Sequence, residues 1–318
     1  MSVKQGPLQI AAWLDELQTN GSQLDLTQLL RYQRLTHVLD LTPKQTIQSK
    51  LAGSYLAKTK GRGMEFDEVR HYQPGDDVRT IDWRVTARTG KVHTKLFREE
   101  KERPVFILTD LSSSMQFGSQ LLLKSVQAAH LAALIAWHVK KTGDKLGGIL
   151  FNDQQIVELK PAGRHVAVLR YLHQLIELQK VNRALPQQQN LANALGQLRR
   201  LARPGSLLFV ISDFSQLDEQ CLRHLQAMRL HNEIRLCQLF DPLERQAPID
   251  CRGAALVSSG KQSFGIELSD QNLWQRFSKQ QSAAQQQFDT SIQLLGLRPR
   301  HFSAAQPLSL QLMEASYG

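Results

Sequence analysis

Residues 105–115 constrain the fold most, because an apolar run of strand length there ends on Asp110 and leads into three serines. A buried parallel strand would bring Asp110 to its carboxyl end, where open α/β sheets place their ligand sites. Ser112 and Ser114 alternate along the following loop, so their hydroxyls can face the same point as the carboxylate. Such oxygen ligands suit Mg²⁺ or Mn²⁺ better than Zn²⁺. The alternative is that these side chains only cap the next helix.

A second apolar segment, residues 206–212 with the sequence SLLFVIS, also ends on an aspartate, Asp213. Two strand-end carboxylates at one edge of a sheet can share one metal ion. The sequence therefore predicts a metal site made of Asp110, Ser112, Ser114 and Asp213, with Asp213 acting directly or through water.

These motifs carry a family resemblance. Residues 110–114 (DLSSS) resemble the D-x-S-x-S signature of von Willebrand factor A domains, whose metal-ion-dependent adhesion site takes an aspartate from a third loop, here Asp213. Four upstream segments resemble the bacterial domain-of-unknown-function family number 58: residues 61–66 (GRGMEF), 70–79 (RHYQPGDDVR), 81–83 (IDW) and 87–89 (ART). The resemblance runs from about Leu51 to the neighbourhood of Leu297. It implies a von Willebrand factor A-like domain and a MoxR-type AAA+ ATPase as partner.

The resemblance also implies a threonine from a second loop, directly before a leucine and a helix. The sequence at this place is QQQNL, residues 187–191. Alignment on Leu191 puts the threonine position on Gln189, with Asn190 beside it. An amide oxygen of either side chain could reach the metal, although a longer side chain changes distance and rigidity. The alternative is a degenerate site in a domain that binds partners without metal.

A chain of 318 residues with 42% hydrophobic content can form one large domain and a smaller one. We predict a helical lead-in at 1–50, a small β-rich subdomain at 51–103 and a von Willebrand factor A-like α/β domain at 104–318. Strands and helices alternate in the last part, which indicates a doubly wound, mostly parallel sheet. The expected strands are 105–108, 146–151, 156–159, one around 207, and 233–240, with a rim hairpin of 254–257 and 264–268. The expected helices are 8–18, 26–39, 119–142, 164–177, 191–202, 218–229 and 272–288.

The expected cellular location of the protein and the redox state of its cysteines rest on signals that the sequence lacks. The first residues lack a small-residue cleavage site, and the most apolar helical stretch, 130–139, is too short to span a bilayer. Cys221, Cys237 and Cys251 have no C-x-x-C spacing and cannot all pair. We expect a cytoplasmic protein with no membrane span and with reduced, buried cysteines.

The net charge of +10 raises the question of nucleic acid as a partner. Acidic residues are interleaved with the basic ones between positions 58 and 103, which is typical of charges that pair with one another in a structural role. No nucleic-acid-binding motif is present. The sequence therefore argues against nucleic acid. Within this region we expect Arg79 and Asp82 to pair and Trp83 to bury its ring, so that the turn has a structural role.

Catalysis is the competing function. The chain has no Gly-x-Ser-x-Gly elbow, no P-loop and no His-Glu-x-x-His motif. His130 and His138 lie two helical turns apart, and core packing explains them better than metal binding. We therefore predict a non-enzymatic protein-binding module that engages partner carboxylates through Mg²⁺ or Mn²⁺, with a MoxR-type ATPase, in protein remodelling or maturation. The alternatives are a metal-free scaffold that docks through its basic small subdomain and, more remotely, a metal-dependent phosphoester hydrolase.

Overall fold

The computed structural model describes residues 7–38, 64–99, 103–180, 189–245, 254–258, 263–267 and 271–314. The chain divides into two compact units, one of Gln48–Glu102 and one of Met1–Ile47 together with Arg103–Gly318. The three-part division at residues 50 and 103 stays a prediction.

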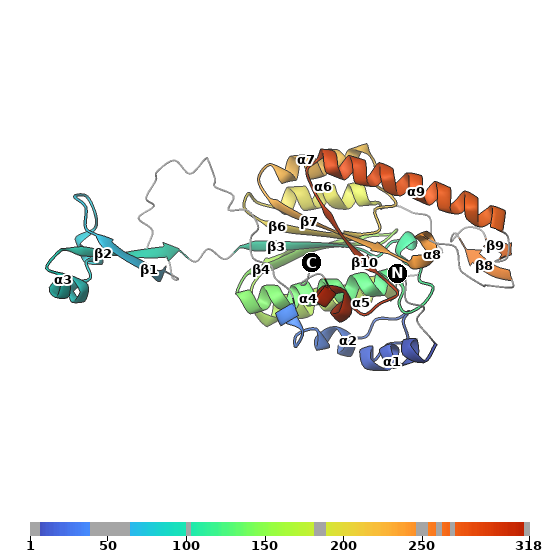
Figure 1. The fold of residues 1–318 in the computed structure, drawn as a ribbon, viewed down its shortest axis with the longest axis horizontal. Coiled ribbons are helices and arrows are strands. Elements are labelled where there is room, and N and C mark those ends of the chain that lie inside the picture. Colours follow the sequence, from blue (N-terminus) through green and yellow to red (C-terminus); the bar gives the residue numbers. More distant parts are fainter. Residues whose placement is uncertain are drawn as a thin grey trace. The chain divides into compact units, whose positions relative to one another are not determined.

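The larger unit is built on a six-stranded sheet in the order β10-β7-β6-β3-β4-β5 (Figure 1). Its strands are β3 (Pro104–Asp110), β4 (Lys145–Phe151), β5 (Ile156–Ala162), β6 (Leu207–Ser212), β7 (Glu233–Phe240) and β10 (Pro299–Ser303). All neighbours are parallel except β5, which runs antiparallel to β4. The predicted doubly wound, mostly parallel α/β sheet is confirmed.

The order of the strands reverses at β3. From there the chain adds β4 and β5 on one side, and it later adds β6, β7 and β10 on the other. Ligands of open α/β sheets bind at such a switch point, beyond the carboxyl ends of the strands. Asp110 ends β3, and Asp213 directly follows β6, so the switch point places both predicted carboxylates side by side.

Helices cover both faces of this sheet (Figure 1). One face carries α4 (Lys124–Thr142) and α5 (Arg164–Lys180), and the other carries α6 (Leu191–Leu201), α7 (Glu219–Arg229) and α9 (Gln271–Leu294). Side chains alternate along β3, so that Val105 and Ile107 enter one hydrophobic core while Phe106 and Leu108 enter the other. Burial on both faces explains why β3 reads as an unbroken apolar run.

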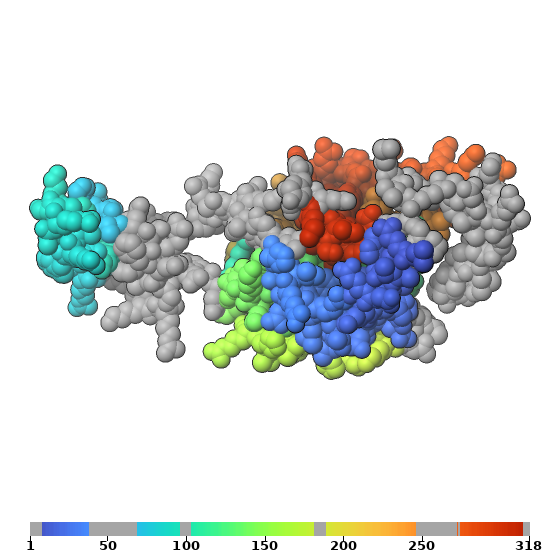
Figure 2. Space-filling view, turned by 60° about the horizontal axis from the view of Figure 1, so that its bottom comes forward, coloured from blue at the N-terminus to red at the C-terminus, as the bar shows by residue number. Residues whose placement is uncertain are grey.

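The first and last helices pack on the α4 side. These elements are α1 (Pro7–Leu17), α2 (Leu26–Arg31), the short 3₁₀ helix η1 (Thr36–Val38) and α10 (Leu308–Glu314). In Figure 2 the N-terminal residues (blue) and α10 (red) lie side by side, and α10 contacts both η1 and α4. The indole N–H of Trp137 in α4 donates to the Leu29 carbonyl of α2 at 3.0 Å.

Several element boundaries differ from the predictions. Helix α4 begins at Lys124 rather than at residue 119, and α2 ends at Arg31 rather than at 39. Helix α9 continues to Leu294, while β10 and α10 were not predicted. The predicted rim hairpin is confirmed by β8 (Ala254–Ser258) and its antiparallel partner β9 (Ser263–Glu267). In the described part of the chain, no helix is both long and apolar enough to cross a membrane.

The histidine and cysteine predictions are also answered. His130 is buried against the ring of Tyr32, and His138 bonds the Thr36 carbonyl at 3.0 Å, so both belong to the packing of α4. Cys221 and Cys237 are buried and free, while Cys251 lies outside the described residues.

The smaller unit contains the antiparallel strands β1 (Met64–His71) and β2 (His93–Glu99), the 3₁₀ helix η2 (Val78–Thr80) and helix α3 (Trp83–Thr89). The expected ion pair between Arg79 and Asp82 is wrong. Its carboxylate accepts the first N–H groups of α3 and lies 3.6 Å from Lys95. The expected burial of Trp83 is also wrong, because this side chain is 67% exposed. A two-stranded sheet with one short helix has little core in which an indole can be buried.

Candidate metal site

Asp110 is the centre of the site. It is 1% exposed, and both oxygens of its carboxylate accept hydrogen bonds. The Ser112 N–H donates to Oδ1 at 2.9 Å, and the Ser212 hydroxyl, at the end of the neighbouring strand β6, donates to Oδ2 at 2.6 Å. Ser212 was not predicted from the sequence as a site residue. The side chain of Asp110 is thus held from two strands at once.

The two predicted hydroxyl ligands lie together. The Oγ atoms of Ser112 and Ser114 are 3.2 Å apart. Ser112 precedes a short 3₁₀ helix, Ser113–Met115, but its side chain makes no capping hydrogen bond there. Helix α4 begins only at Lys124, and Asp110 does not cap it. Helix capping therefore does not explain the D-x-S-x-S sequence.

Asp213 lies on a strained turn. Phe214, the next residue, has a φ of +57°, in the left-handed region that bulky side chains rarely adopt. Its N–H donates to the Ser212 hydroxyl at 3.0 Å, and its ring packs on Phe288 with centroids 5.2 Å apart. These contacts fix the turn, and the Ser215 N–H then donates to Oδ1 of Asp213 at 3.0 Å.

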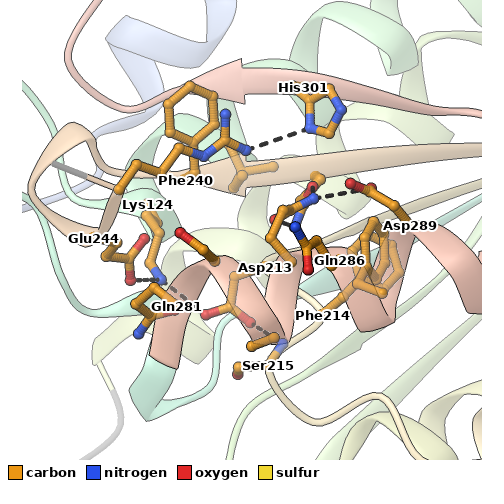
Figure 3. A pocket seen from close by; sticks show the side chains of 17 residues that line it. Lys124, Asp213, Phe214, Ser215, Phe240, Glu244, Gln281, Gln286, Asp289 and His301 are labelled. Atoms are coloured by element: carbon orange, nitrogen blue, oxygen red, sulfur yellow. Dashed lines mark hydrogen bonds and ion pairs between the residues drawn. The ribbon is translucent and has the colours of Figure 1, made fainter. Parts of the chain in front are cut away.

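A buried lysine, which was not predicted from the sequence, neutralises Asp213 (Figure 3). Lys124 is 2% exposed, and its Nζ lies 2.9 Å from Oδ2 of Asp213 and 2.6 Å from Oε1 of Glu244. Glu244 belongs to α8 (Pro242–Arg245), which directly follows β7. A lysine in the first turn of an apolar helix is disfavoured by the helix dipole, and this was the available signal in the sequence.

The pKa shifts show how charge is distributed. Burial, and then the negative charge of Asp213, raise the pKa of Asp110 to about 7. Burial would also raise the pKa of Asp213, but the Lys124 ammonium and the hydrogen bonds from Ser215 together outweigh it, and the pKa is lowered. Burial lowers the pKa of Lys124, whereas Asp213 and Glu244 raise it more strongly, so the net shift is upward. Asp110 is therefore the buried carboxylate whose charge lacks a cation.

The residues fit a hard divalent cation. Asp110 offers an uncompensated charge, and Ser112 and Ser114 offer hydroxyl oxygens, which suit Mg²⁺ or Mn²⁺. Within the described residues, no three His, Cys, Asp or Glu side chains form a metal cluster. A cation here would thus depend on hydroxyls together with one or two carboxylates.

In the second loop, the two predicted amide ligands, Gln189 and Asn190, already make hydrogen bonds at the start of α6. The Asn190 side chain caps α6 by accepting the Asn193 N–H at 2.9 Å. Oε1 of Gln189 accepts from the Asn193 amide at 3.2 Å. Both predicted amide oxygens are thus engaged at the start of α6, and either would have to share or release Asn193 in order to bind a metal ion.

Asp153, in the turn after β4, joins these loops and was also missed. Its Oδ2 accepts the Ser113 N–H at 3.0 Å, and its backbone carbonyl accepts the Gln189 N–H at 3.0 Å. The first and second loops are therefore connected through one residue.

A cavity of about 510 Å³ lies beside Asp213 (Figure 3). Its walls come from the loop after β6, from Lys124, from the end of β7 with α8, from His301 in β10 and from α9. The Arg245 guanidinium stacks over the Phe240 ring, 3.4 Å from the centroid, so one wall is both aromatic and cationic. Asp213 thus faces both the candidate metal site and a cavity large enough for a few side chains.

Comparison with known proteins identifies the family. The model of the family described as "Protein of unknown function DUF58" matches residues 68–287. The chain belongs to this family. An uncharacterized protein of Mycobacterium tuberculosis (strain ATCC 25618 / H37Rv), Rv1480, is 33% identical over 217 residues, which are 66% of this chain and 65% of the relative. The chain therefore spans just under two thirds of that relative's length. YeaD of Bacillus subtilis (strain 168) is 41% identical over 49 residues, 15% of this chain and 12% of YeaD.

Solved structures show weaker similarity. The conserved hypothetical protein BatB from Bacteroides thetaiotaomicron aligns with a TM-score of 0.39 and 14% identity, covering 68% of this chain and all of BatB. The SpRpn10 VWA domain aligns with a TM-score of 0.37 and 12% identity, covering 68% of this chain and 95% of that domain. TM-scores this low do not by themselves establish a shared fold, and the assignment of the α/β fold comes from the strand order.

We expect Lys124→Met to lower the free energy of unfolding by about 3–5 kcal/mol, because the buried carboxylate of Asp213 and the half-buried carboxylate of Glu244 lose their shared cation. Urea unfolding monitored by circular dichroism measures this change. Lys141→Met, at an exposed position of the same helix, is the matched control and should change stability little. Equal stability of the two variants would contradict a charge-neutralising role for Lys124.

We expect Asp110→Asn to stabilise the metal-free protein at pH 8 and less so at pH 5. The folded-state pKa of Asp110, about 7, lies above its ordinary value of 3.8, so the stability that this group contributes is complete below pH 3.8 and is lost as pH rises through about 7. Asparagine removes that loss, which is on the order of a few kcal/mol. Thermal unfolding in chelator at both pH values measures it, and an equal gain at the two pH values would contradict the raised pKa.

Proposed function

We propose that this protein is a non-enzymatic protein-binding module whose D-x-S-x-S loop holds Mg²⁺ or Mn²⁺ and presents it to a carboxylate of a partner protein. The observation that carries the proposal is the convergence of the Ser112 and Ser114 hydroxyls, 3.2 Å apart, beside the uncompensated carboxylate of Asp110. A cation held largely by neutral hydroxyls stays attractive to an incoming Asp or Glu.

The chain's own residues have separate tasks in this proposal. Asp110 supplies the charge that retains the cation, while Ser112 and Ser114 supply neutral oxygens. Asp213 acts through water, because the Lys124 ammonium already neutralises its charge. The metal supplies an electrostatic bridge to the partner.

The cavity beside Asp213 supports the binding of a partner segment. Phe240 and Phe288 give it apolar walls, while glutamines of α9 give it polar ones. A partner carboxylate bound at the metal would bring its neighbouring side chains toward this cavity. Affinity would then come from apolar burial as well as from the bridge.

The partner that we propose is a MoxR-type AAA+ ATPase, which the family resemblance implies, and the shared task is protein remodelling or maturation. The free, buried thiols of Cys221 and Cys237 are compatible with the proposed cytoplasmic location.

We expect millimolar Mg²⁺ or Mn²⁺ to raise the melting temperature, and Asp110→Ala to abolish the increase. With free metal about tenfold above its Kd, the stabilisation is about 1.4 kcal/mol, which a thermal scan resolves. Asp289→Asn, which removes a carboxylate from the exposed side of α9, should keep the increase. Identical melting curves of the wild type in metal and in chelator would favour the metal-free alternative.

We expect Asp213→Asn to weaken metal binding and partner binding while the fold stays intact, because Glu244 still pairs with Lys124. Calorimetric titration with the candidate ATPase, with and without chelator, measures this. Changing the bridging carboxylate of the partner to its amide should have the same effect as the chelator. Binding that ignores the chelator would reject the metal bridge, and metal-dependent hydrolysis of a phosphate ester, lost in Asp213→Asn, would support the hydrolase alternative.

A second candidate function, metal-free docking through the small basic unit, is favoured by one observation. Trp83 is 67% exposed, and Arg84 and Arg88, also exposed, share helix α3 with it. Exposed tryptophan and arginine side chains are typical energetic centres of protein interfaces.

For this candidate we expect Trp83→Ala to weaken partner binding by about 2 kcal/mol, roughly thirtyfold, without lowering the melting temperature. Val92→Ala, another exposed apolar position of the same unit, is the control and should leave binding unchanged. Binding that depends on Trp83 and is insensitive to chelator would favour this candidate over the metal bridge.

A further inference from the structure

We propose that Asp153 is a direct ligand of the cation and takes the place of the threonine that the family resemblance implies in the second loop. This inference rests on the proposed metal site. It assigns to that site a residue from a different part of the chain, the turn between β4 and β5.

The turn is rigid and lies next to the D-x-S-x-S loop. Asp110 is in register with Phe151 of β4, and the Leu111 N–H donates to the Phe151 carbonyl at 2.8 Å. Asp153 thus follows by two residues the position that pairs with Asp110. The Asn152 side chain fixes the turn by accepting two N–H groups within it and by donating to the carbonyl of Leu178 in α5.

One oxygen of Asp153 is directed at the loop, and the other has no partner. Oδ2 accepts the Ser113 N–H, the residue between the two candidate serine ligands. Oδ1 is buried without a hydrogen-bond partner among the described residues, and the residue is only 7% exposed. An unpaired buried carboxylate oxygen is costly, and a bound cation would satisfy it.

The charge balance also favours a second carboxylate in the site. Lys124 already neutralises Asp213, so Asp110 alone would face a divalent ion. Asp153 adds a second anionic oxygen ligand, which strengthens the hold of the site on Mg²⁺ or Mn²⁺ and leaves octahedral positions open for a partner's carboxylate. The site then contains two carboxylates and two hydroxyls, in agreement with the absence of a three-member acidic cluster in the described residues.

The position of the second loop agrees with this assignment. Asp153 accepts the Gln189 N–H through its backbone carbonyl, so it stands between the first loop and the second. Gln189 and Asn190 meanwhile bond to Asn193 through their side-chain oxygens. Asp153 is therefore an acidic residue that is hydrogen-bonded directly to the loop in which the threonine is missing.

The first test is calorimetric titration of the full chain with Mn²⁺. We expect Asp153→Asn to weaken Mn²⁺ binding at least about tenfold. The metal-free fold should be retained, because the amide can still accept the Ser113 N–H. Asp289→Asn is the matched control, since it removes one carboxylate from the same end of the sheet, and it should bind Mn²⁺ as the wild type does.

The second test asks whether the side chain touches the metal. Asp153→Cys should shift the preference from Mn²⁺ toward Cd²⁺, because thiolate is a soft ligand, whereas Asp289→Cys should not. Thermal unfolding in each metal reports this preference and does not depend on the stability of Asp153→Asn.

The outcomes separate the two proposals. If the wild type binds Mn²⁺ and Asp153→Asn binds it equally well, the role of Asp153 is rejected while the proposed metal site remains. Equal weakening in Asp153→Asn and Asp289→Asn, or no Cd²⁺ preference in Asp153→Cys, also rejects direct ligation. If the wild type binds no metal, both proposals fail.

Discussion

The structure depends on the burial of negative charge at the carboxyl ends of the central strands. Asp110, Asp213 and Glu244 come from three different segments, and one ammonium group, that of Lys124, lies between two of them. Burying charges is costly unless they are paired, so the geometry of the surrounding loops must keep Lys124 in place. Asp110 is left as the unpaired member, and its raised pKa is the result.

The same ion pairs connect the candidate metal site to the cavity. Lys124 bonds to Asp213 on the metal side and to Glu244 in α8, and all three line the cavity. A change of charge at Asp213 would therefore change the electrostatic interaction of Lys124 with Glu244. In the proposed function this gives a physical route by which an ion and a partner segment influence each other's binding.

Much of the fold and half of the site could be predicted from local sequence. Strands β3 and β6 are buried on both faces, so they read as apolar runs, and Asp110 and Asp213 mark their ends. The serines follow in the same segment and were predicted with them. Lys124 and Asp153 gave no comparable signal, because a lysine in an early helical turn and an aspartate in a turn are both usually at the surface. The prediction for Trp83 was wrong in the opposite direction. Its indole was expected to be buried, but its unit lacks a core large enough to bury it.

The sequence by itself determined most strands of the sheet other than β10, that the strands alternate with helices, and that β3 ends on a carboxylate followed by hydroxyls. The periodicity of apolar residues, and the burial that it indicates, can be read from consecutive residues. Only the tertiary structure decided which charges meet. The strand order brings the ends of β3, β4, β6 and β7 to one edge, where Asp153 reaches Ser113 and Lys124 reaches Asp213. Pairings between residues 40 and 89 positions apart depend on chain crossings, and no local pattern encodes them.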